Sequence, residues 1–166
     1  PPGGTCRDVE NTDLSIITLI TNDPIWPNVT IQSLGRSLIA RAEIDTSINV
    51  PRYNGEAVDV MVRNTGSVML TVENIFLSDP ADDSCGMPPC DCARSSSPLC
   101  QIFGFGELQE TTFDLPPDET RRVNVYFRTN EQESFEIELW WSTTDPLLPT
   151  AVTNIFVRGL GDRPED

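Results

Sequence analysis

Short runs in which apolar and polar residues alternate recur along the chain, and this is the pattern of half-buried β-strands. One such run covers residues 56–63, and after the Asn-Thr-Gly turn at 64–66 the alternation resumes at Leu70. The apolar positions then shift by one residue at Ile75, which would turn the later side chains to the opposite face. We therefore expect a hairpin around the turn, with a β-bulge or a change of sheet near Glu73.

The same pattern predicts further short strands, separated by segments rich in Gly, Pro and Asp. The predicted strands are 38–44, 56–63, 68–78, 101–105, 110–114, 120–128, 134–142 and 151–158. Their inward-facing residues should form the core, namely Val58, Val60, Val62, Leu70, Val72, Ile75, Leu77, Val123, Val125, Phe127, Phe135, Ile137, Leu139, Ile155 and Val157. No segment keeps a helical apolar period over several turns, so we predict an all-β fold, an antiparallel β-sandwich.

An internal repeat indicates how the chain is organised. The pattern Thr-x-Asp-Pro-x-x-Pro begins at Thr21 and again at Thr143, an offset of 143 − 21 = 122 residues. Both copies lie between two predicted strands, and the later copy should have two additional residues in its turn. Repeats at a fixed period mark arrays of one structural unit. We therefore interpret residues 1–37 as the closing hairpin of a preceding unit, 38–161 as a complete unit and 162–166 as a tail.

The composition argues against several function classes. Eleven Lys plus Arg against 26 Asp plus Glu give a net charge of −15, which repels the phosphates of nucleic acids. The chain has no His and no Lys, which removes Ser–His and Cys–His nucleophile pairs, His-containing zinc sites and Schiff-base chemistry. No apolar run approaches the roughly 20 residues of a membrane span. We expect a protein that is not an enzyme, and we predict no catalytic, cofactor-binding or metal-binding residues.

Several stretches resemble one known family. The stretch VRNTGSVMLTVENIFLS, from Val62, is similar to the Asn-Thr-Gly hairpin of immunoglobulin-like domains of the Hydin and abnormal-spindle type. LPPDETRRVNVYFRT, from Leu115, resembles their proline-rich loop and following strand. LWWSTTDPLLPTAVTNIFVRGLG, from Leu139, and TLITNDPIWPNVTIQSLG, from Thr18, resemble their closing hairpin. The resemblance implies an immunoglobulin-like sandwich, which in bacteria occurs in tandem in large secreted or surface-anchored proteins, including the choice-of-anchor group.

A cysteine-rich insertion at 79–100 departs from the family pattern. Its cysteines, Cys85, Cys90, Cys92 and Cys100, have the spacing C-x4-C-x-C-x7-C, which lacks the C-x2-C of structural zinc sites. We expect two disulfides instead. A Cys90–Cys92 bridge is disfavoured sterically, which leaves Cys85 with Cys90 or Cys92, and Cys100 with the other. Disulfides imply an extracellular, cell-surface or periplasmic location.

Other candidate residues have plain structural interpretations. Cys6 has three alternatives, a partner in the preceding repeat, in another chain or in the insertion, and of these we expect the first. The acidic residues of the insertion offer oxygen ligands of the kind calcium takes, but they lack the D-x-D-x-D-G spacing, so a solvated acidic loop is the better interpretation. These residues are Asp79, Asp82, Asp83 and Asp91. The sequence Asn28-Val29-Thr30 is a glycosylation sequon where the source has that machinery.

Two function hypotheses follow. The first is a non-enzymatic structural and interaction module, whose partners are neighbouring immunoglobulin-like repeats or other protein subunits, self-assembly included, with the insertion as its variable recognition surface. The alternative is a carbohydrate-binding sandwich that stacks sugars on exposed tryptophans. The candidates are Trp26 in a turn and Trp140 and Trp141 on one strand, where one of the pair must face away from the other.

Overall fold

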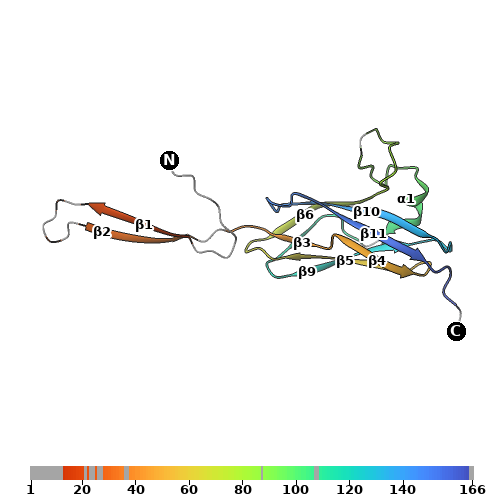
Figure 1. Ribbon diagram of the computed structural model, residues 1–166, viewed down its shortest axis with the longest axis horizontal. Coiled ribbons are helices and arrows are strands. Elements are labelled where there is room, and N and C mark those ends of the chain that lie inside the picture. Colours follow the sequence, from red (N-terminus) through yellow and green to blue (C-terminus); the bar gives the residue numbers. More distant parts are fainter. Residues whose placement is uncertain are drawn as a thin grey trace. The chain divides into compact units, whose positions relative to one another are not determined.

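The computed structural model describes residues 13–20, 22, 25, 28–35, 38–86, 88–106 and 109–164 (Figure 1). Contacts between Cα atoms divide the chain into two compact units, Pro1–Ile39 and Ala40–Asp166. The first unit contains an antiparallel hairpin of β1 (Asp13–Ile20) and β2 (Asn28–Gly35). The second unit contains two further sheets, which hold the core of the protein.

The two copies of the repeated hairpin have the same turn length. Ile20 pairs with Asn28 in the first copy, and Ser142 pairs with Thr150 in the second. The separation is the same in both, since 28 − 20 = 150 − 142. The expectation that two additional residues lengthen the later turn is therefore wrong. They lie beyond the turn, in the second strand.

The second unit is a sandwich of a five-stranded and a four-stranded sheet, with strand orders β4-β11-β10-β6-β8 and β3-β5-β9-β7 (Figure 1). The strands are β3 (Ala42–Ile44), β4 (Ser47–Arg52), β5 (Ala57–Asn64), β6 (Leu70–Ser78), β7 (Phe103–Phe105), β8 (Phe113–Leu115), β9 (Thr120–Phe127), β10 (Ser134–Thr143) and β11 (Thr150–Gly159). One short helix, α1 (Pro98–Ile102), lies within the described residues. It replaces the beginning of the strand predicted at 101–105.

The first strand of the unit is divided between the two sheets. β3 pairs antiparallel with β5 in the four-stranded sheet, and β4 pairs parallel with β11 in the five-stranded sheet. The sequence predicted one strand over 38–44 and missed the second. The predicted antiparallel sandwich is confirmed, and the structure adds one parallel pair, β4 with β11. β4 carries Pro51, which is tolerated because this strand lies at the edge of its sheet.

The predicted core is confirmed. Every predicted core residue is buried except Phe135, which is half-buried and packs against the others. The structure adds residues that the alternating pattern did not select, and these are Ala40, Phe103, Phe113, Leu115 and Trp141. Trp141 is the largest fully buried side chain, and its indole Nε1 donates to Thr153 Oγ1 at 3.0 Å. Trp140 points to the outer face, as alternation along a strand requires.

The repeated motif closes the β10–β11 hairpin and ties it to the start of the unit. The carboxylate of Asp145 is buried, and it accepts hydrogen bonds from the backbone of Leu147 and Ala42, each at 2.8 Å. Thr143 Oγ1 donates to the carbonyl of Leu148 at 2.7 Å. The spacing of the motif therefore has a structural cause. Its Thr and Asp satisfy the backbone groups of the turn and of the incoming strand β3.

The Asn-Thr-Gly turn does not close a hairpin, because β5 and β6 belong to different sheets. The expectation of a hairpin at this point is wrong. The turn carries the chain across the sandwich, and Asn64 holds it there. Its fully buried amide Nδ2 donates to the carbonyls of Val68 and Leu115, both at 2.8 Å, and its Oδ1 accepts from Gly66 N at 2.9 Å. Since Leu115 belongs to β8, one side chain links the two sheets.

Of the two alternatives that the sequence left open near Glu73, a bulge or a change of sheet, the structure shows the bulge on β6. Asn74 pairs with Ser142 and Val72 pairs with Thr143, so Glu73 is the additional residue between two successive pairs. Glu73 and Asn74 are both exposed, and Ile75 returns to the core. The bulge turns alternate side chains from Ile75 onward back to the core face. The strand does not change sheet, because both halves of β6 pair with β10.

We predict that Asn64→Ala lowers the free energy of unfolding by about 3 kcal/mol, because it leaves buried carbonyl and amide groups without partners. Asn54→Ala is the matched control. Asn54 is exposed, its Nδ2 bonds Asp162 at 2.9 Å, and its loss should cost less than about 0.5 kcal/mol. Urea denaturation measures the free energy of unfolding of both variants. Equal losses of unfolding free energy in the two variants would show that the hydrogen bonds of Asn64 contribute no more to stability than an exposed one.

Candidate functional site

The cysteine-rich insertion covers the outer edge of β6. β8 pairs with residues 70–72 at one end of β6, and the insertion takes over at the other end. There Ser78 forms an antiparallel bridge with Asp91, and Cys92 N donates to the carbonyl of Leu77 at 2.8 Å. The unpaired backbone groups of an uncovered strand edge can pair with another chain. By bonding the edge of β6, the insertion blocks such pairing at this end of the strand.

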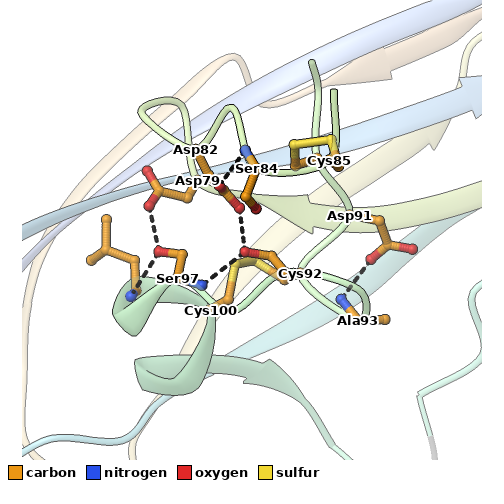
Figure 2. The surroundings of a disulfide bond; sticks show 12 residues. Asp79, Asp82, Ser84, Cys85, Asp91, Cys92, Ala93, Ser97 and Cys100 are labelled. Atoms are coloured by element: carbon orange, nitrogen blue, oxygen red, sulfur yellow. Dashed lines mark hydrogen bonds between the residues drawn. A yellow bond between two sulfur atoms is a disulfide. The ribbon is translucent and has the colours of Figure 1, made fainter. Parts of the chain in front are cut away.

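Two disulfides hold the insertion together, as predicted. They join Cys85 to Cys90 and Cys92 to Cys100, which is one of the two pairings that the sequence left open. The second bridge connects the segment paired with β6 to helix α1, which leads directly into β7 (Figure 2). The insertion is thus tied to both sheets. Cys6 lies outside the described residues.

The carboxylates of the insertion bind its own backbone and hydroxyl groups. Asp79 accepts from Ala81 N at 2.8 Å and from the Ser97 hydroxyl. Figure 2 shows Ser97 in turn accepting from the first turn of α1, as its N-cap. Asp91 accepts from Ala93 N at 2.9 Å. These carboxylates therefore replace backbone partners in a loop that has few apolar side chains to bury.

Asp82 forms the second centre of this network. Hydrogen bonds from Ser84 and from the Ser95 hydroxyl hold the pKa of the Asp82 carboxyl below its ordinary value. Within the described residues, His, Cys, Asp and Glu side chains do not gather in groups of three or more that could hold a metal ion. Asp79, Asp82 and Asp91 instead each cap their own turn, and Asp83 is exposed.

Within the part of the chain that the structure describes, two clefts border the insertion. The larger, about 380 Å³, lies between β6, the disulfide-bonded segment and β7, and includes Ile75, Cys92, Cys100 and Phe103 in its lining. The smaller, about 180 Å³, lies between the prolines of the insertion and the outer face of the five-stranded sheet. The sequence did not predict the smaller cleft. The only signal for it was the cluster of prolines near the cysteines.

The two described tryptophans, Trp140 and Trp141, face opposite sides of their sheet. Trp141 is buried in the core and cannot stack on a ligand. Trp26 lies outside the described residues. Trp140 is half-buried on the outer face, where its ring lies parallel to that of Phe76, with 6.2 Å between centroids and 9° between planes. Its Nε1 donates to Glu138 Oε2 at 2.8 Å. The sequon residues Asn28 and Thr30 are exposed on β2.

Comparisons with known proteins identify the fold. No protein-family model matches the sequence, and no curated protein matches it. Among solved structures, the class 5 fimbriae chaperone CfaA is similar with a TM-score of 0.50 and 11% identity, over 75% of this chain and 58% of that one. The periplasmic chaperone SfaE has a TM-score of 0.49 and 10% identity, over 75% and 60%. A PapD-like domain of human CEP192 has a TM-score of 0.46 and 12% identity, over 80% and 94%.

The two packed sheets and the similarity to CfaA identify the second unit as an immunoglobulin-like β-sandwich. The chain spans about three fifths of the length of the two chaperones that it resembles. At such low identity the similarity extends to the fold alone, and the narrower resemblance to the Hydin and abnormal-spindle type stays a prediction. The described residues include no helix that is long and apolar enough to cross a membrane.

We predict that replacing Cys92 and Cys100 by serine loosens the edge of β6 and leaves the sandwich folded. Closing a loop of this length contributes roughly 2–3 kcal/mol, so the backbone amide of residue 92 should exchange its hydrogen up to about a hundredfold faster in this variant. The Val60 and Val125 amides should stay strongly protected, because they lie in the core of the four-stranded sheet, which remains folded.

Replacement of Cys85 and Cys90 by serine is the matched control for the same measurement. This bridge closes a shorter loop and does not include the residue bonded to β6. It should change the exchange of the Cys92 amide much less. Global unfolding of the Cys92/Cys100 variant would mean that the sandwich depends on the insertion.

Proposed function

We propose that this protein is a non-enzymatic, extracytoplasmic interaction module built from immunoglobulin-like units, with the disulfide-bonded insertion as its recognition surface. The pair of disulfides within the insertion carries the proposal. Bridges of this kind persist in oxidising compartments, where they stabilise segments that bury little apolar surface. The insertion has this character, since its buried residues are few and its turns rest on Asp and Ser side chains.

The test is the redox state of the cysteines in the native protein. Mass mapping without reduction should find Cys85–Cys90 and Cys92–Cys100 in protein isolated from its source, after free thiols are blocked at lysis. Four alkylated thiols would contradict an extracytoplasmic location. Binding of zinc by the same cysteines would contradict it equally.

The absence of catalytic function remains part of the proposal. The chain has no His or Lys to activate a nucleophile. Its remaining option is a pair of carboxylates, and Asp79, Asp82 and Asp91 are engaged in the turns of the insertion. Carbohydrate binding, the alternative function, would depend on Trp140 among the described tryptophans.

The first unit supports a partner that is itself an immunoglobulin-like sheet. In the register shared by the two hairpins, Leu19 corresponds to Trp141 and Ile31 to Thr153, since each pair differs by 122 residues. Trp141 and Thr153 are 1% and 0% exposed against the opposite sheet, whereas Leu19 and Ile31 are 47% and 45% exposed. The first hairpin thus has the register of a closing hairpin with its core-facing positions uncovered. We infer that a neighbouring repeat, or a second copy of the chain, covers it.

We predict that the full chain self-associates through this hairpin, and that Leu19→Asp weakens the association by about tenfold or more. Burying a leucine contributes roughly 1.5–3 kcal/mol, and 1.4 kcal/mol is a factor of ten. Thr18→Asp is the matched control, because Thr18 is exposed on the opposite face of the same strand. Sedimentation velocity over a concentration series measures both variants.

One result would contradict this arrangement directly. If the wild-type chain is monomeric and the amides of β1 and β2 nevertheless exchange slowly, these strands are covered within their own unit. The assignment of residues 1–37 to an incomplete repeat would then be wrong. Equal weakening by the two substitutions would indicate a charge effect and would remove Leu19 from the contact.

A further inference from the structure

The smaller cleft combines apolar walls with a carboxylate. It lies where the insertion meets the outer face of β10, because Ser78 pairs with Glu138 and brings the beginning of the insertion beside that strand. The residues that line it are Asp79, Pro80, Pro88, Pro89, Glu138 and Trp140, together with Ser78. Its volume of about 180 Å³ is below the ~300 Å³ at which small-molecule sites begin. It has room for one side chain of a partner.

Trp140 is held in place at this cleft. Its ring packs parallel to Phe76 on the neighbouring strand, and its Nε1 donates to Glu138. These two contacts hold the indole in one orientation, so the Trp140 side chain is already ordered before a ligand binds. The hydrogen bond to the indole uses Glu138 Oε2. Among the described residues, no arginine lies within ion-pair distance of Glu138 or over the ring of Trp140.

Elsewhere the protein covers its own aromatic rings with arginine. Arg121 lies 4.0 Å from the centroid of the Phe113 ring. Arg128 lies 5.9 Å from the centroid of Tyr126, and Arg163 lies 5.9 Å from that of Tyr53. Trp is the aromatic side chain that attracts a cation most strongly, and Trp140 has no such partner within the described chain.

The chemistry of the cleft selects a cation on an apolar stem. Proline rings and an indole face favour methylene groups, and Glu138 favours positive charge at the end of the stem. Asp79 adds negative charge to the lining of the cleft, although its oxygens already accept hydrogen bonds from Ala81 and Ser97. The net charge of −15 attracts a basic partner to the molecule from a distance.

We propose that this cleft binds an arginine side chain of a protein partner. The guanidinium group stacks on Trp140 and pairs with Glu138, and the methylene stem contacts the prolines of the insertion. Arginine fits better than lysine because its planar, weakly hydrated head group stacks on aromatic faces. This assignment rests on the proposed function, since it names the chemistry by which the insertion would recognise another protein.

The test titrates the full ¹⁵N-labelled chain with the peptide N-acetyl-Gly-Arg-Gly-amide and follows the indole Nε1 signals by NMR. The Trp140 signal should shift and saturate. The Trp141 signal should not move, because that indole is buried and bonded to Thr153. The same peptide with lysine should bind more weakly, and the peptide with glutamine should not bind measurably.

Glu138→Gln should weaken the arginine peptide by about fivefold, which is the upper range for a solvent-accessible ion pair. Glu136→Gln is the matched control, because it removes the same charge from the same face of β10 and lies outside the cleft. Its effect should be less than about twofold. Equal effects of the two variants, or an unmoved Trp140 signal, would overturn the site. Lysine binding as tight as arginine would overturn the choice of ligand. Neither failure would alter the disulfide mapping or the self-association, which test the proposed function separately.

Discussion

The sandwich depends on one buried amide. Asn64 ends β5 in one sheet and binds the carbonyl of Leu115 in the other, while its Oδ1 fixes the turn at Gly66. A chain that crosses between sheets leaves backbone groups without ladder partners, and burying them unpaired is costly. Asn is suited to this position because one short side chain supplies both donors and an acceptor. The crossing of the chain from β5 in one sheet to β6 in the other therefore rests on these contacts.

Edge protection explains the remaining irregularities of the second unit. The first strand is divided so that β3 completes one sheet and β4 the other. The buried Asp145 carboxylate accepts a hydrogen bond from the backbone of Ala42, the first residue of β3. At the opposite edge, β8 and the cysteine-rich insertion share β6 between them. The insertion thus performs a structural role that a longer neighbouring strand would otherwise take, and its disulfides compensate for the short pairing.

Strands with one buried face were predictable, because their apolar and polar residues alternate. The shift in this alternation also indicated the irregularity at Glu73, which is a bulge. Alternation does not report which sheet a strand joins, so the turn at Asn64 resembled a hairpin. β4 escaped notice because its side chains are only half-buried and Pro51 interrupts it. The cleft beside Trp140 was not predictable, because its walls come from distant segments that meet only through the pairing of Ser78 with Glu138.

The acidic residues of the insertion and of β10 have different roles. Asp79, Asp82 and Asp91 fix its turns, so their charge is committed to internal hydrogen bonds. The accessible carboxylate at the cleft comes from the sheet, on Glu138, which is positioned by β10 and by the indole of Trp140. A site formed by a rigid strand and a disulfide-bonded loop keeps its geometry even though the loop buries few apolar side chains. The loop can then vary in sequence and change the apolar wall, while the strand keeps the charge and the aromatic ring in place.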